Sequence, residues 1–196
     1  MRNTRNIVPF IDVLFTLLMV FVCITILLKT KSDSDNESYR QQNAIYLIAL
    51  NWEGNSDMDL WAKDPQNRLV CFKRREGGEG SLFSLNRDCL GAQTTEIGED
   101  GTPINKINEE IISIRGTFVG EYVVNVHAYD MKGSAPVKTI VKLIKNKPYK
   151  VIVEKDILIS ATGSEETFFR FSLDKDGSVV DVNDLPVSLI EMQSTQ

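Results

Sequence analysis

Asp12 is the only charged residue in an apolar stretch that runs from residue 7 to residue 28. Thr16, Met19 and Cys23 follow it at spacings that place all four side chains on one face of a helix. A carboxyl group in a low-dielectric site can take up and release H⁺. The stretch offers few other oxygen ligands for Na⁺ besides the hydroxyl of Thr16, so we predict that Asp12 carries an ion, with H⁺ preferred to Na⁺. The path of this ion would be lined by Thr16, Met19 and Cys23.

The same stretch predicts a transmembrane helix over residues 7–28. A helix over residues 9–28 rises about 30 Å, which matches the hydrocarbon core of a bilayer. Each large apolar side chain favours insertion by roughly 0.3 to 0.6 kcal/mol, and together they outweigh a cost of about 3 kcal/mol for one aspartate. Two alternatives stay open. Asp12 could reach the lipid headgroups, or Arg2, Arg5 and the apolar run could form a signal peptide, although no typical cleavage site follows.

Residues 6–13 of this stretch read NIVPFIDV and are followed by LFTLLMVF. This segment resembles the N-terminal helix of the ExbD and TolR proteins and, more distantly, of the flagellar stator subunit MotB, over residues 5–28. The resemblance implies a homodimer of this helix inside a pentameric ring of a multispanning ExbB-, TolQ- or MotA-like partner, with Asp12 as the ion carrier. It also implies a single-pass protein of the bacterial inner membrane, with a cytoplasmic N-terminus and a periplasmic or otherwise extracytoplasmic C-terminal domain.

From Ile45 onward the hydrophobic period changes to two, which is typical of half-buried β-strands. At least seven such runs, separated by turn-forming residues, cover residues 45–52, 57–63, 68–74, 121–129, 137–144, 150–155 and 166–173. They predict an all-β domain, an antiparallel β-sandwich. Residues 82–109 are polar and indicate a long loop. The predicted organisation is a short cytoplasmic N-terminus (1–6), a transmembrane helix (7–28), a polar linker (29–44) and a β-sandwich domain (45–196).

Two short motifs of the domain carry a second resemblance. Trp52 is followed by Asp57, Asp59, Leu60, Asp64 and Pro65, and the second motif consists of Gly120, Tyr122, Val124 and Val126. Both resemble a little-characterised family of bacterial extracytoplasmic β-sandwich domains, which implies a fold but no activity. The domain resembles neither the small α/β domain of ExbD and TolR nor the peptidoglycan-binding domain of MotB.

Asp57 and Asp59 alternate onto one face of a predicted strand, and Asp64 lies nearby in the sequence. Carboxylate oxygens are ligands of Ca²⁺, so a weak calcium site at these three residues is one interpretation. No EF-hand spacing supports it. Aspartates at strand ends also accept hydrogen bonds from loop N–H groups, and this second interpretation is favoured.

Cys71 and Cys89 are an even pair of cysteines in the predicted domain. In an oxidising compartment they are candidates for a disulfide, which would stabilise the domain by roughly 3 kcal/mol. Buried thiols are the alternative.

Composition and motifs exclude several function classes. The whole chain has a net charge of −5; residues 1–31 contain four basic residues and one acidic residue, which leaves 18 basic and 26 acidic residues in residues 32–196, a net charge of −8. Such an acidic domain is not expected to bind nucleic acid. His127 is the only histidine and no nucleophile, phosphate-binding or metalloprotease motif is present, so we expect neither an enzyme nor a cofactor.

The sequence therefore leads to two hypotheses. The first is a subunit of an ion-driven membrane motor, in which Asp12 carries the ion and the β-sandwich transmits or anchors the motion outside the cytoplasm at an unknown target. The second is a β-sandwich binding module that a membrane helix only tethers, with no ion transport.

Overall fold

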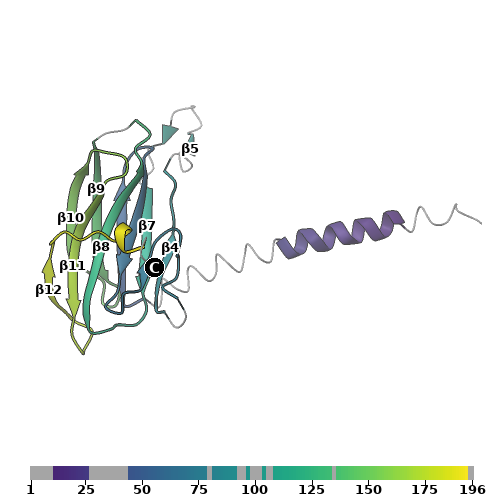
Figure 1. The fold of residues 1–196 in the computed structure, drawn as a ribbon. Coiled ribbons are helices and arrows are strands. Elements are labelled where there is room, and N and C mark those ends of the chain that lie inside the picture. The colour runs from purple at the N-terminus through teal and green to yellow at the C-terminus, as the bar shows by residue number, and fades with distance from the viewer. Residues whose placement is uncertain are drawn as a thin grey trace, which may run out of the picture. The chain divides into compact units, whose positions relative to one another are not determined.

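The computed structural model of the chain describes residues 11–26, 44–78, 81–91, 96–97, 103–104, 108–133 and 136–193. The chain divides into two compact units, Met1–Tyr39 and Arg40–Gln196. The first unit contains a helix over residues 11–26, and the second contains the β-sheets (Figure 1).

The N-terminal helix corrects the prediction of a transmembrane helix over residues 7–28. Within the described ranges, no helix combines the length and the apolar character that are needed to cross a membrane. The predicted N-terminus (1–6) and the predicted linker (29–44), apart from Ala44, lie outside the described residues.

The second unit is built from two antiparallel sheets of five strands each. The first sheet has the order β10 (Lys150–Ile159), β9 (Val137–Lys145), β1 (Tyr46–Trp52), β7 (Asn108–Ile114) and β4 (Phe83–Arg87). The second sheet has the order β12 (Val179–Asn183), β11 (Glu165–Leu173), β8 (Gly120–Asp130), β2 (Asp57–Lys63) and β3 (Leu69–Val70). A separate pair is formed by β5 (Glu96–Ile97) and β6 (Pro103–Ile104), and a short helix, α2 (Ile190–Gln193), follows the last strand.

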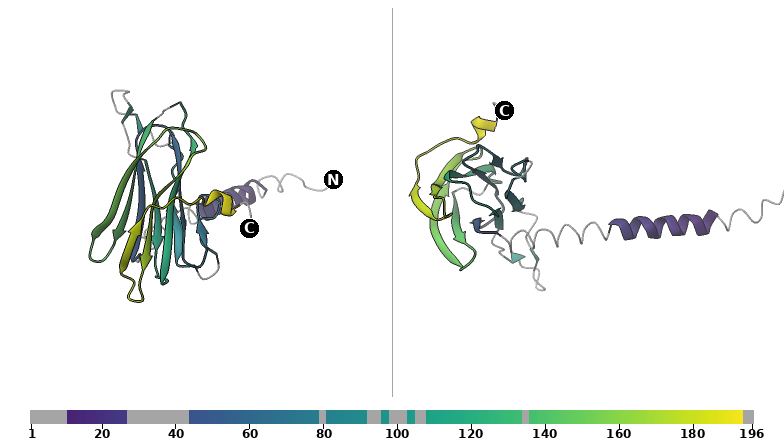
Figure 2. Two further views of the ribbon diagram at one scale, coloured as in Figure 1. Left: turned by 60° about the vertical axis from the view of Figure 1, so that its left-hand side comes forward. Right: turned by 90° about the horizontal axis from the view of Figure 1, so that it is seen from below.

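The two sheets face each other across one hydrophobic core, and Figure 2 shows them as two layers of the domain. Alternate residues of each strand point into this core, as the period of two predicts. In β11, a bulge between Thr167 and Phe169 adds one residue, so that Phe168 and Phe169 are both buried. Phe171 stacks on Tyr122 of β8, with ring centroids 4.9 Å apart and planes 7° from parallel.

The outer face of the second sheet is covered by the C-terminal segment. Trp61 and Val123 form a second buried cluster with Leu189. The carboxylate of Glu165 holds this segment in place, because it accepts hydrogen bonds from the backbone N–H of Leu189 and the hydroxyl of Ser188, each at 2.7 Å.

The predicted antiparallel β-domain agrees with these sheets, but the predicted loop over residues 82–109 is wrong in part. That segment contains all of β4, β5 and β6 and the first two residues of β7. The strand β7 was not among the predicted strands, and it lies between β1 and β4 in the first sheet.

We expect Phe171→Ala to lower the free energy of unfolding by about 3 to 5 kcal/mol, because it removes a buried aromatic ring and leaves a cavity beside Tyr122. Tyr149, which is 72% exposed, is the matched control, and Tyr149→Ala should change stability by no more than about 0.5 kcal/mol. Urea unfolding followed by tryptophan fluorescence measures both. Equal effects of the two substitutions would contradict the assignment of the core.

Candidate metal centre

Three carboxylate side chains from both sheets of the domain lie close together. Asp59 of β2, Asp88 after β4 and Glu110 of β7 each offer an oxygen atom, and these atoms all lie within 4.8 Å of one another. Asp59 and Glu110 are buried, and Asp88 is partly exposed. Because β2 and β7 belong to different sheets, this acidic cluster of Asp59, Asp88 and Glu110 bridges the two layers.

Glu110 is fixed by the backbone on both sides of the cluster. Its Oε2 accepts a hydrogen bond from the N–H of Leu60 at 2.7 Å, and its Oε1 accepts one from the N–H of Cys89 at 3.1 Å. The strand β2 pairs with β3 only through Ala62 and Lys63. The carboxylate of Glu110 therefore takes the place of a neighbouring strand, because it supplies the acceptor that Leu60 would otherwise lack.

Burial dominates the electrostatics of the cluster. Loss of water raises the pKa of Glu110 well above its ordinary value, and the charges of Asp59 and Asp88 raise it further, against the lowering effect of its two backbone donors. Burial likewise raises the pKa of Asp57, followed by the charge of Asp59, while Lys132 lowers it. The cluster therefore needs a balancing positive charge or a proton.

Two carboxylate oxygens at this place are buried and have no hydrogen-bond partner in the described part of the chain. They are Oδ1 of Asp57, a residue that is 8% exposed, and Oδ1 of Asp88. On the other side of Asp59, Nδ1 of His127 lies 3.4 Å from Oδ2. Unpaired buried oxygens are costly, and they point to a missing positive partner.

The backbone around the cluster is held by three loops that pack on one another. The Nζ of Lys132 donates a hydrogen bond to the carbonyl of Leu90 at 2.8 Å, and the hydroxyl of Ser56 donates one to the carbonyl of Met131 at 3.1 Å. Gly91 has a φ of +68°, and a Cβ there would lie 2.3 Å from the carbonyl oxygen of Ser56. The loops thus preorganise the segment that carries Asp88.

Asp64, the third residue of the predicted calcium site, lies elsewhere. It is 1% exposed, and its carboxylate accepts hydrogen bonds from the N–H of Gln66 and Arg68 at 2.9 Å and from Nε of Arg68 at 2.7 Å. It follows the end of β2, five residues or about 16 Å along the extended chain from Asp59. The loop-capping interpretation therefore describes Asp64, whereas Asp59 joins two residues that the sequence analysis did not name.

The acidic cluster has the chemistry of a site for a hard cation. An oxygen-to-oxygen limit of 4.8 Å is twice the Ca²⁺–oxygen distance of about 2.4 Å, so one ion could contact all three side chains. Each carboxylate oxygen has more than one lone pair, so Glu110 can accept its backbone donors and still bind an ion.

The helix over residues 11–26 contains all four residues of the predicted ion path. Asp12, Thr16, Met19 and Cys23 share one face of it by their spacing. The hydroxyl of Thr16 donates a hydrogen bond to the backbone carbonyl of Asp12 at 2.8 Å, so its hydrogen is used within the helix and its oxygen stays an acceptor. The ion-carrying role of Asp12 stays a prediction.

The predicted disulfide between Cys71 and Cys89 is not formed. Cys71 is a free thiol in the cluster with Trp61, and burial raises its pKa. Cys89 belongs to the main core, and its thiol donates to Oδ1 of Asn108 at 3.6 Å. The two cysteines lie in different hydrophobic clusters, and the alternative of buried thiols is the one that the structure shows.

Two residues of the acidic cluster were missed because each needs information from outside its own segment. Glu110 lies at an inward position of β7, as do Asn108, Ile112 and Ile114. The inward positions therefore alternate with a period of two, but two of them are polar, so the hydrophobic pattern is incomplete. A charged residue at an inward position was the available signal. Asp88 follows a strand that its sequence did not reveal.

Comparison of the chain with protein-family models, with curated proteins and with solved structures found no match. The resemblances to ExbD, TolR and MotB and to a β-sandwich family therefore stay predictions.

We expect the protein in EDTA to lose stability as the pH rises above about 4.5, because the pKa of Glu110 is higher in the folded than in the unfolded state. At pH values between the pKa of the unfolded state and that of the folded state, only the folded state holds this proton. The proton therefore stabilises the fold fully at low pH, and this stabilisation falls by up to about 1.4 kcal/mol per pH unit as the pH rises. The free energy of unfolding in urea, measured from about pH 5 to about pH 8, tests this.

Other groups also titrate in this range, so Glu110→Gln is the reference. The difference in stability between the wild type and Glu110→Gln should change with pH in the direction given. A difference that stays constant from about pH 5 to about pH 8 would contradict the raised pKa.

Proposed function

We propose that residues 44–193 form a binding module whose two sheets are joined by a divalent cation, Ca²⁺ in the first place, bound by Asp59, Asp88 and Glu110. The observation that carries this proposal is the convergence of three carboxylate oxygens within 4.8 Å of one another. The unpartnered Oδ1 atoms of Asp57 and Asp88 are a second, independent observation that favours a positive charge at this place.

The hydrogen bonds of Glu110 favour its ionised form. Both of its oxygens accept a backbone N–H, and such donors stabilise the charged carboxylate. No ion pair is recorded for Glu110 or Asp88 in the parts of the chain with a defined structure, so a bound cation is the partner that satisfies the observed geometry.

The ligand set favours Ca²⁺ over other metals. It consists of carboxylate oxygens only, whereas Zn²⁺ sites are built from cysteine and histidine with or without carboxylates. Mg²⁺ requires near-ideal octahedral geometry and is usually bound by one or two carboxylates. Asp88 is partly exposed, which leaves room for water ligands of a larger ion. Extracellular modules bind Ca²⁺ with a Kd of about 10⁻⁴ to 10⁻³ M, and the predicted extracytoplasmic location is consistent with an affinity in this range.

The motor hypothesis stays a prediction from residues 5–28. It requires a helix that crosses a membrane, which the described residues do not provide. The binding-module hypothesis also includes a membrane helix, as a tether, but it places the binding function in the domain alone, and the acidic cluster of the domain supports that part of it.

We expect the full-length chain to bind Ca²⁺, and Asp88→Asn to weaken this binding by at least about tenfold, because it removes a charged ligand without removing side-chain volume. Asp88 is partly exposed, so this substitution should leave the fold intact. Terbium luminescence excited through Trp61, which lies two residues from Asp59, followed by displacement with Ca²⁺, measures the affinity.

Asp156→Asn is the matched control, because Asp156 is an exposed aspartate on β10 that pairs with Lys138. It should bind Tb³⁺ and Ca²⁺ like the wild type. If Asp88→Asn and Asp156→Asn weaken Ca²⁺ binding equally, the binding depends only on the net charge of the domain. That result would contradict the proposed site.

A further inference from the structure

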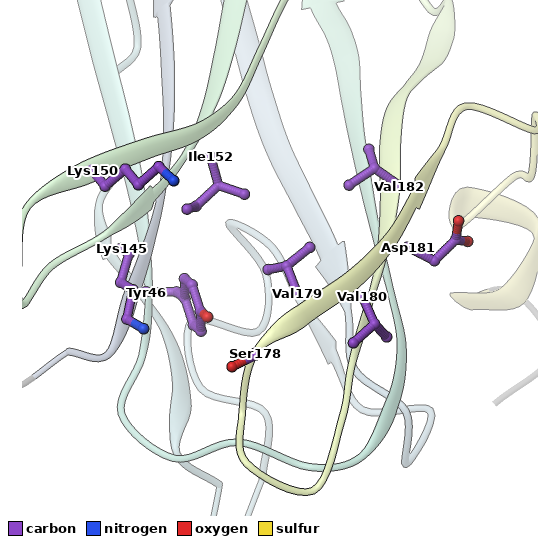
Figure 3. A pocket seen from close by; sticks show the side chains of 9 residues that line it. All are labelled: Tyr46, Lys145, Lys150, Ile152, Ser178, Val179, Val180, Asp181 and Val182. Carbon is purple, nitrogen blue, oxygen red and sulfur yellow. The ribbon is translucent and has the colours of Figure 1, made fainter.

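The domain has a groove far from the acidic cluster, at the start of β1 and between the edge strands β10 and β12. The groove has a volume of about 440 Å³ and is lined by Tyr46, Lys145, Lys150, Ile152 and residues 178–182 (Figure 3). Tyr46 begins the seven-residue strand β1, whereas Glu110 of the acidic cluster pairs with Leu50, so the two sites are separated by four residues, or about 13 Å, along β1.

The groove exists because the sandwich is open on this flank. Within the described sheets, β10 pairs only with β9 and β12 pairs only with β11, so each strand has one free edge. Ile152 and Val179 pack only partly against the core, and Val182 from the same flank is exposed. Apolar side chains and the backbone of a free strand edge therefore border the same space.

Two lysines at this groove have no acidic partner among the described residues. Lys145 and Lys150 face each other directly across the β9–β10 ladder. Like charges in this arrangement repel and destabilise the sheet. Three other lysines of these strands do have partners, because Lys138, Lys142 and Lys155 pair with Asp156, Glu154 and Asp184 respectively. In the part of the chain that the structure defines, no ion pair is recorded for Lys145 or Lys150.

We propose that this groove binds an extended peptide segment of a partner protein, with a carboxylate between Lys145 and Lys150 and an apolar side chain against Ile152, Val179 and Val182. The two lysines outnumber the one acidic residue of the lining, Asp181, so the charge complementarity selects an acidic residue at the lysines. The free edge of β12 offers backbone groups to an added strand. The sequence of β12, VVDVN, has the β-branched residues that favour such pairing. This inference rests on the proposed binding-module function and names its partner class, but it does not depend on the cation.

The test uses the full-length chain and a fluorescein-labelled probe peptide, Ser-Val-Thr-Val-Asp-Asp, with a second probe in which both aspartates are asparagines. Fluorescence anisotropy should show saturable binding of the acidic probe with a Kd in the range of about 1 μM to about 1 mM. The asparagine probe and the double variant Lys145→Gln/Lys150→Gln should each bind at least about tenfold more weakly. Both lysines lie at the surface of the groove, and their removal relieves a repulsion, so the variant should fold.

The matched control is Lys138→Gln/Lys142→Gln, which makes the same change in net charge on β9 outside the groove. It should bind the acidic probe like the wild type. Equal loss in the two double variants, equal binding of the two probes, or no saturable binding of the acidic probe would each overturn the inference.

A further variant separates a partner peptide from a second copy of the chain. Val182→Asp places a charge in the groove and should abolish probe binding while sedimentation shows a monomer for both proteins. Self-association of the wild type that Val182→Asp removes would show that the groove is an interface between copies, and it would overturn the inference. Ca²⁺ binding is measured on the same variants. If the peptide probe does not bind but Ca²⁺ does, the inference about the groove is wrong and the proposed cation-binding function is unaffected.

Discussion

The domain depends on the buried carboxylate of Glu110, which stands where one sheet lacks a strand. In a complete sheet, the N–H of Leu60 would donate to an uncharged carbonyl of the neighbouring strand. Here the N–H groups of Leu60 and Cys89 donate to the carboxylate of Glu110, which is buried and has lost its hydration. That charge constrains the surroundings. It makes the two further acidic residues beside it, Asp59 and Asp88, costly.

The distribution of charge follows from the same sheet topology. On the flank where β2 meets β7, a side chain from one sheet reaches the backbone of the other, and the acidic cluster closes the gap. On the flank of β10 and β12, the hydroxyl of Tyr46 likewise reaches from one sheet to the carbonyl of Gly177 in the turn before β12, and the ladder brings Lys145 opposite Lys150. A domain with a net charge of −8 in its sequence range thus places two lysines side by side on this flank.

Strands with apolar inward residues could be predicted from the sequence, and strands with polar inward residues could not. In β1 and β8, every inward position is apolar or aromatic, so the period of two was visible. In β7, Asn108 and Glu110 occupy inward positions, so only the last residues of the strand carried the signal. The candidate site shows the same limit: Asp59 was named from local alternation, but its neighbours come from segments 29 and 51 residues away.

The cysteines and Asp64 show why sequence spacing is a weak guide to proximity in a sandwich. Successive side chains of a strand point to opposite faces of the sheet, so two residues that are close in the sequence can lie on different sides of the sheet. Cys71 packs under the C-terminal segment on the outer face, whereas Cys89 faces the core between the sheets. Asp64 follows β2 at the end remote from Asp57, where its carboxylate accepts hydrogen bonds from the N–H groups of the following turn. Proximity in this fold is set by which sheet face a strand turns inward, and that choice is made by the core as a whole.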